Sequence, residues 1–197
     1  MTGVDLPFAC SCGTVNGKLV GVSPTNGNRL ECYCGDCRAA EAFATPNRAI
    51  PDGPVQLYQT TPAHIRIDAG TGQLAVFSLS PKGVLRWYAN CCGTMLFNTL
   101  RNPKIAFAAV FTDAISDANA LGPVRARANI QNGDGTSRNE GFGRMLRSFA
   151  KGAIPARFTG SWKNTPFFDP DTLEPVSEIY VLSKEERAAV TPNLKVS

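Results

Sequence analysis

The sequence predicts a mainly β protein that carries an additional helical segment near its C-terminus. The 197-residue chain contains 18 glycines and 14 prolines, both above average usage, and these residues favour frequent turns over long helices. In the first half, apolar residues come in short runs bounded by turn sequences, which is typical of strands. Helical periodicity begins only beyond about residue 137.

Four segments of the first half are predicted to be strands. Residues 17–22 alternate between polar and apolar side chains, as a half-buried strand does. Residues 73–79 follow a Gly-Thr-Gly turn, and residues 84–88 lie just beyond Pro-Lys-Gly, so these two segments should form a hairpin. The longer apolar run 104–111 is expected to be a central strand.

Two helices are predicted in the second half. Apolar residues recur there at the spacing of one helical face: Phe142, Met145, Leu146, Phe149 and Ala150. This helix should end before Gly152 and Pro155. Ser183 and Glu186 have the spacing of a capping box that opens a short final helix. We expect residues 1–125 to form a cysteine-rich zinc-binding β domain, with residues 126–197 as an extension packed on it.

Charge and hydropathy exclude some classes of function. Twenty Lys and Arg residues face 16 Asp and Glu residues, giving a net charge of +4, far from the dense basic loading of an obligate nucleic-acid binder. No run approaches the ~20 apolar residues of a membrane span. Residues 1–7 lack the basic and apolar regions of a secretion signal. A cytoplasmic location is expected, without membrane or nucleic-acid partners, and the sequence does not indicate an oligomeric state.

Cysteines supply the strongest pattern. Seven cysteines and a single histidine occur in the chain, and the cysteines form three groups: Cys10 and Cys12; Cys32, Cys34 and Cys37; Cys91 and Cys92. An odd number in a reducing compartment is a poor disulfide framework. Gly13, Gly35 and Gly93 provide the tight turns that let neighbouring thiolates converge on one ion. Sulfur donors favour zinc first and an iron–sulfur cluster second.

A purely structural role is less expected than metal binding for the cysteines, but more expected for the histidine. Single buried cysteines often serve as small apolar residues, but a C-x-C followed by a C-x-C-x-x-C is much less expected by chance. His64 lies among apolar residues of an expected strand, so a structural role is favoured. Seven thiolates divide naturally into a closed site of four and a site of three that leaves one position open for water or substrate.

The three cysteine groups, in this order, resemble the glutathione-dependent formaldehyde-activating enzyme family, which includes centromere protein V. The matching segments are residues 10–13, 32–38 and 86–97, roughly the first half of the chain. The resemblance implies a β-tent fold of short antiparallel strands with one structural zinc ion and a second, labile or catalytic, zinc ion on three thiolates. It also implies binding of a glutathione adduct and carbon–sulfur lyase chemistry of the S-hydroxymethylglutathione synthase type.

One position departs from the family pattern. The family's third group places a cysteine where this chain has Ala89, and Cys91 stands next to Cys92 instead. Adjacent cysteines can bind one metal only if the peptide between them turns both sulfurs inward. Two alternatives follow: Cys91 becomes the fourth ligand, or three sulfurs share the site with another group.

The resemblance assigns the chemistry to Cys32, Cys34 and Cys37, with Arg38 as a cofactor-binding residue. A small thiol such as glutathione would ionise on the open zinc ion and attack the aldehyde carbon. Cys37 precedes a short helix expected over residues 38–43, and a helix N-terminus beside Arg38 lowers the pKa of a thiol. The alternative is a non-enzymatic zinc-binding module with protein or nucleic-acid partners, because fold does not fix function.

Two further groups of residues are candidates for ligand contacts. Four basic residues of the C-terminal segment could attract the carboxylates of glutathione or a phosphate: Arg138, Arg144, Arg147 and Lys151. A solvated helix face is the more common role of such a group. Trp87 and Tyr88 could wall a pocket, but neighbours in a strand point to opposite faces, so at least one of them should lie in the core.

Overall fold

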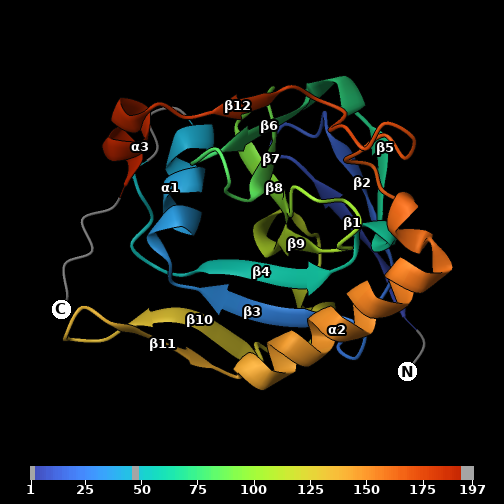
Figure 1. Ribbon diagram of the computed structural model, residues 1–197, viewed down its shortest axis with the longest axis horizontal. Coiled ribbons are helices and arrows are strands. Elements are labelled where there is room, and N and C mark those ends of the chain that lie inside the picture. Colours follow the sequence, from blue (N-terminus) through green and yellow to red (C-terminus); the bar gives the residue numbers. More distant parts are fainter. Residues whose placement is uncertain (1–2, 46–48, 192–197) are drawn as a thin grey trace.

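The computed structural model describes residues 3–45 and 49–191, and within them the chain forms two β-sheets flanked by three α-helices (Figure 1). The small sheet has the order β1 (Val4–Ala9), β2 (Asn16–Val22), β5 (Ile65–Ala69) and is antiparallel. The prediction of a mainly β chain with a C-terminal helical segment is confirmed. No helix of the described residues is long and apolar enough to cross a membrane.

The large sheet has nine strands in the described residues. Their order is β11 (Ser137–Glu140), β10 (Ala126–Gln131), β3 (Asn28–Cys32), β4 (Val55–Thr60), β9 (Ala108–Phe111), β8 (Thr94–Thr99), β7 (Leu85–Ala89), β6 (Leu74–Ser78), β12 (Ile179–Val181). Neighbours are antiparallel except for the parallel pairs β10–β3 and β12–β6. The predicted hairpin is confirmed as β6 and β7.

The predicted central strand is shorter than expected. Strand β9 lies between β4 and β8 near the middle of the large sheet, but it starts at Ala108. Upstream, the side chain of Asn102 accepts a hydrogen bond from the Lys104 amide, and its carbonyl accepts one from the Ile105 amide. This asparagine turn gives the backbone local partners, so the chain turns here before the strand begins.

Apolar side chains form two main cores on opposite sides of the large sheet. One core packs between the two sheets around Phe167, whose ring lies 5.0 Å from that of Trp87 and 5.2 Å from that of Phe97. The other lies beneath helix α1 (Gly35–Ala44) and includes Phe77, with Tyr88 against it. Trp87 and Tyr88 therefore face opposite sides, as strand geometry predicts.

The remaining helices are α2 (Phe142–Thr159) and α3 (Lys184–Val190), and short 3₁₀ turns connect several strands. These turns are η1 (Pro62–His64), η2 (Thr71–Gln73), η3 (Thr112–Ala114), η4 (Ala118–Leu121) and η5 (Ser161–Lys163). Ser183 and Glu186 make both hydrogen bonds of the capping box, which confirms the predicted start of the last helix.

The prediction that the long helix ends before Gly152 and Pro155 is wrong. Helix α2 continues through both residues and ends at Thr159, where Gly160 is the C-cap with a left-handed φ of 77°. Proline costs the helix one backbone hydrogen bond. Burial compensates for that loss, because Ala156 packs into a small core with Ala106 and Trp162. Tertiary packing of this kind is invisible to local sequence signals.

The apolar face of α2 is also rotated from the expected one. Phe142 and Leu146 are 50% and 53% exposed, whereas Ala153 and Ala156 are buried. Arg138 lies on β11 rather than on the helix. Of the predicted apolar face, Met145 packs against the core beneath α1 and Phe149 lies against Phe107, whereas Phe142 and Leu146 stay on the outer surface.

Candidate metal centres

Four cysteines from two distant turns meet in one group. Cys10 and Cys12 follow β1 of the small sheet, and Cys91 and Cys92 lie in the turn between β7 and β8 of the large sheet. Their sulfurs all lie within 4.8 Å of one another, with closest pairs at 3.3–4.0 Å. Sulfurs placed tetrahedrally at the usual Zn–S distance lie about 3.8 Å apart. The group could therefore hold a metal ion with four sulfur ligands.

The family pattern has a cysteine at the position of Ala89, which left open whether Cys91 or a group other than sulfur completes this site. The structure favours Cys91 as the fourth sulfur. Ala89 is the last residue of β7 and is fully buried, and the Cys91 sulfur lies 3.3 Å from that of Cys12. The turn needs Gly93, whose φ is 74° and where a Cβ would lie 2.3 Å from the carbonyl oxygen of Ala44. This close approach packs the cysteine turn against the end of α1.

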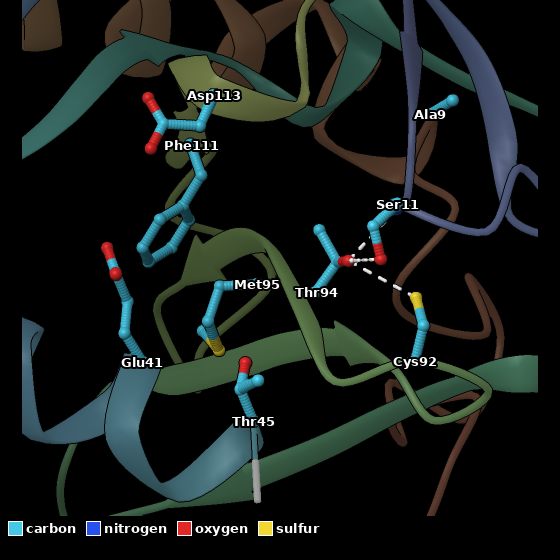
Figure 2. Close-up of a pocket in the computed structure, with 9 residues that line it drawn as sticks. All are labelled: Ala9, Ser11, Glu41, Thr45, Cys92, Thr94, Met95, Phe111 and Asp113. Carbon is cyan, nitrogen blue, oxygen red and sulfur yellow. Dashed lines mark hydrogen bonds between the residues drawn. The ribbon is translucent and has the colours of Figure 1, made fainter. Parts of the chain in front are cut away.

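Local hydrogen bonds favour ionisation of Cys92. Burial opposes the charged form, but hydrogen bonds from Ser11 and Thr94 outweigh it and lower the pKa of the Cys92 thiol to about 5. The Thr94 oxygen lies 3.2 Å from the Cys92 sulfur and also accepts a hydrogen bond from the Ser11 amide (Figure 2). The same threonine thus joins the turn after β1 to the turn before β8.

The second group contains three cysteines from one short segment. Cys32 ends β3, Cys34 is the N-cap of α1, and Cys37 lies in the first turn of that helix. The Cys34 sulfur accepts a hydrogen bond from the Cys37 amide at 3.3 Å and lies 3.3 Å from the Cys32 sulfur. All three sulfurs lie within 4.8 Å of one another. No fourth His, Cys, Asp or Glu of residues 3–45 and 49–191 joins them.

The thiolate at the helix N-terminus is Cys34 rather than Cys37. The helix begins at Gly35, three residues earlier than the position expected from sequence. Hydrogen bonds from the Cys32 and Cys37 thiols, aided by the Cys37 amide and the charge of Arg86, lower the pKa of Cys34 to about 2. The same contacts raise the pKa of Cys32 and of Cys37. Without a metal, the group therefore carries its first negative charge on Cys34.

A buried arginine lies against this group. Arg86 is 3% exposed, and its Nη1 lies 4.0 Å from the Cys37 sulfur and 3.4 Å from Oδ1 of Asn98. Asn129, which has a positive φ of 57°, places its amide nitrogen 3.9 Å from the Cys32 sulfur. These donors stabilise negative charge on the sulfurs. Cysteine spacing does not predict this role of Arg86, although an arginine inside the apolar run 84–88 is an available signal.

Arg38 and His64 lie outside both groups of sulfurs. The Arg38 guanidinium donates to the carbonyl of Pro51 and lies 3.8 Å from the Asp52 carboxylate, so it attaches that loop to α1. Its expected contact with a cofactor stays a prediction. The His64 ring nitrogen Nδ1 lies 2.7 Å from the carbonyl oxygen of Val20, which is a structural contact.

A pocket of about 360 Å³ lies between the end of α1 and the turn that carries Cys92 (Figure 2). It is lined by Ala9, Ser11, Glu41, Thr45, Cys92, Thr94, Met95, Phe111 and Asp113. Glu41 lies one helical turn after Cys37, and both residues are buried. The pocket therefore offers hydroxyl groups and two carboxylates next to the four-cysteine group and one turn from the three-cysteine group.

Comparisons with known proteins place the chain in a family without assigning it a role. No curated protein matches it. A crystal structure of a Rhodobacter sphaeroides protein from structural genomics is 18% identical, with a TM-score of 0.42, and the match covers 60% of this chain and 96% of that one. A family model described as a family of unknown function, DUF6151, matches residues 1–168. The chain therefore belongs to the DUF6151 family.

Proposed function

We propose that both cysteine groups bind zinc, and that the three-cysteine site takes a small thiol and activates it for reversible addition to an aldehyde. The four-cysteine site is then closed and structural. The observation that carries the proposal is the three-sulfur group, which has no fourth protein ligand among the described residues. A zinc site with three protein ligands keeps a position for an external ligand.

The donor sets fit zinc better than an iron–sulfur cluster. Both groups consist of sulfur alone, and a soft donor set of this kind selects zinc. An iron–sulfur cluster is usually held by four protein ligands, whereas the second group supplies three. The resemblance of residues 10–13, 32–38 and 86–97 to the glutathione-dependent formaldehyde-activating enzymes supports glutathione as the thiol and formaldehyde as the aldehyde.

The chain's own residues would carry out most of the chemistry. Zinc, when bound, supplies a positive charge that lowers the pKa of an added thiol. Arg86 balances the surplus negative charge of three thiolates around a dication. The thiol sulfur forms a bond to the carbonyl carbon, the π electrons move to the carbonyl oxygen, and that oxygen takes a proton. Nothing is oxidised or reduced in this addition.

The pocket beside α1 would receive the aldehyde end of the adduct. Hydroxyl groups of Ser11, Thr45 and Thr94 line it and can donate hydrogen bonds to a carbonyl oxygen. Glu41 and Asp113 line the same pocket and can take the thiol proton and return it to the developing alkoxide. The reverse sequence breaks the carbon–sulfur bond, which is lyase chemistry.

Cobalt substitution tests this function. Cobalt(II) in the three-cysteine site has visible absorption that depends on its ligands, so glutathione should shift the spectrum saturably. The exchange of formaldehyde with its glutathione adduct, measured by NMR, should be faster with the zinc protein than without it. Both effects should be absent in Cys34→Ser and retained in Arg101→Met, a substitution remote from the sulfurs. A protein that binds two metal ions but shows neither effect would be a non-enzymatic zinc module.

A further inference from the structure

A second pocket lies away from both cysteine groups. It has a volume of about 420 Å³ and is formed by the loop between β2 and β3, the residue before β10, and the first half of α2. The three elements lie side by side in Figure 1, and α2 contacts both β3 and β10. The lining residues are Pro24, Thr25, Gly27, Asn28, Arg125, Arg144, Arg147, Ser148 and Lys151.

The pocket gathers positive charge without a compensating carboxylate. Four of its lining residues are cationic, none is acidic, and none of the four cations forms an ion pair within the described part of the chain. Nearby arginines outside the pocket behave differently. Arg127 lies 2.8 Å from the Glu31 carboxylate, and Arg138 lies 3.3 Å from that of Glu140. The pocket therefore holds four cations without a counter-charge, and their mutual repulsion favours an anionic ligand.

A buried amide adds an independent observation. Asn28 lines the pocket and is 3% exposed, yet its amide nitrogen Nδ2 is buried and has no hydrogen-bond partner among the described residues. A buried donor without a partner costs free energy, because it has lost its water without replacing it. An acceptor oxygen of a ligand in the pocket would supply that partner.

The walls of the pocket are held in place before any ligand arrives. Arg125 donates from Nη1 to the carbonyl of Pro24 at 3.2 Å, which joins the β2–β3 loop to β10. Helix α2 starts at a glycine N-cap, Gly141, that offers no side-chain acceptor to the first amides. The positive end of the helix dipole therefore adds to the field of Arg144 and Arg147.

We propose that this pocket binds the phosphate group of a phosphorylated small molecule. A phosphate monoester carries up to two negative charges and several acceptor oxygens, which suits four cations and an amide donor. The volume lies within the range of small-molecule sites, so it accommodates the phosphate together with part of the molecule that bears it.

This site is separate from the proposed thiol chemistry. Asn28 opens β3 and Cys32 closes it, so the pocket and the three-cysteine group lie at opposite ends of one strand, about 13 Å apart. Phosphate binding does not require zinc in either cysteine group, and failure of one proposal leaves the other standing.

Calorimetric titration of the full chain with inorganic phosphate and with pyrophosphate tests the proposal. We expect saturable binding of one anion per chain. The double variant R147Q/K151Q should weaken it by about tenfold or more, since it removes two charge-assisted contacts. Arg157→Gln removes the same type of charge from α2 outside the pocket and should leave affinity within about twofold, as exposed charges interact weakly at a distance. Asn28→Asp should abolish binding.

Vesicles of phosphatidylcholine with phosphatidic acid distinguish the source of the phosphate. Binding of free phosphate without vesicle binding assigns the site to soluble esters. Vesicle binding that R147Q/K151Q abolishes assigns it to a lipid headgroup with the same chemistry. The proposal is overturned if no probe binds saturably, or if Arg157→Gln weakens binding as much as the double variant. Binding that is seen only with long duplex DNA, and in proportion to its length, also overturns it.

Discussion

Arg86 shows how a single buried side chain can determine the properties of a cysteine group. Arg86 is 3% exposed, its Nη1 atom faces Cys37, and its Nε atom has no partner in the described residues. A buried charge without a counter-charge is strongly unfavourable. Three thiolates around a zinc ion would carry one net negative charge, which matches the single positive charge of the arginine.

Replacing Arg86 should weaken metal binding at one site only. We expect Arg86→Met to lower zinc affinity of the three-cysteine group by about 10- to 100-fold, the usual effect of losing an outer-shell partner. The four-cysteine group should retain its zinc. Competition with a chromophoric chelator measures both affinities. Arg101→Met is the matched control, because within residues 3–45 and 49–191 Arg101 donates only to the carbonyls of Gly83 and Ser80. Equal loss in both variants would contradict the role of Arg86.

The sequence predicts which cysteines are candidate metal ligands, but not which other side chains lie against their sulfurs. Cysteine spacing is local, so the pairs and the triplet could be recognised from the chain itself. Arg86 and Asn129 lie 49 and 97 residues from the sulfurs that they face, and only the folded sheet brings them together. The choice of Cys91 as the fourth sulfur likewise depends on the turn geometry around Gly93.

The two cysteine groups connect different elements of the fold. The four-cysteine group joins the turn after β1, in the small sheet, to the β7–β8 turn of the large sheet. The three-cysteine group joins the end of β3 to the start of the helix that directly follows it. A link between distant segments restricts the unfolded chain far more than a link within six residues.

Substitutions in the two groups should therefore differ in their effect on stability. Cys12→Ser is expected to unfold the protein or to lower its melting temperature strongly, since metal binding at that clamp is part of the folding free energy. Cys34→Ser should remove one zinc ion and leave the fold nearly intact. Thermal melting by circular dichroism and zinc content on the same preparations measure both. If Cys34→Ser is as damaging as Cys12→Ser, the three-cysteine zinc is structural too.

Pro155 provides a test of how α2 is held together. The residue lies inside the helix and is exposed, and a proline there removes a backbone hydrogen bond. Pro155→Ala should stabilise the protein by about 1 kcal/mol or more, given the difference in helix propensity and the partial offset from a freer unfolded chain. Pro123→Ala, outside any helix, is the control and should not stabilise. A lower unfolding free energy for Pro155→Ala would contradict this view of the helix.

Strands were easier to predict than the long helix. Strands β2, β6 and β7 follow local alternation and turn residues, which the sequence displays directly. The course of α2 depends on Ala156 packing against Ala106 and Trp162, and that packing overrides the local stop signals at Gly152 and Pro155. The unpaired cations of the second pocket are likewise a product of tertiary structure.

At the scale of the whole molecule, the large sheet contributes side chains to both main cores. One of its residues, Tyr58, also connects the sheet to the β2–β3 loop. The Tyr58 side chain is fully buried in β4, and its hydroxyl donates to the carbonyl of Ser23 at 2.9 Å. Burial raises the pKa of Tyr58 from 10.0 to about 12. The folded state therefore keeps the phenol neutral over a range of pH in which the unfolded chain ionises it.

The sign of the pH dependence follows from that raised pKa. The contribution of Tyr58 to stability is fully present below pH 10 and is lost as the pH rises from 10.0 to about 12. Its size is about 2–3 kcal/mol. Tyr58→Phe should lower the free energy of unfolding by about 1 kcal/mol at neutral pH, because the hydrogen bond to Ser23 is missing. Its free energy of unfolding should also fall less steeply as the pH rises above 10. Denaturant unfolding of both proteins across this range measures the difference. If the free energy of unfolding falls equally steeply with pH in both proteins, ionisation of the Tyr58 phenol does not contribute to the alkaline loss of stability.

The central claim is that one zinc site is closed by four protein sulfurs and the other keeps a position for an external thiol. Zinc K-edge X-ray absorption on protein loaded with two zinc ions per chain, before and after glutathione, tests it most directly. We predict about 3.5 sulfurs per zinc at about 2.3 Å, together with a light-atom ligand, rising to about 4 sulfurs with glutathione. Four sulfurs per zinc before glutathione is added, or a spectrum that glutathione leaves unchanged, would contradict the account.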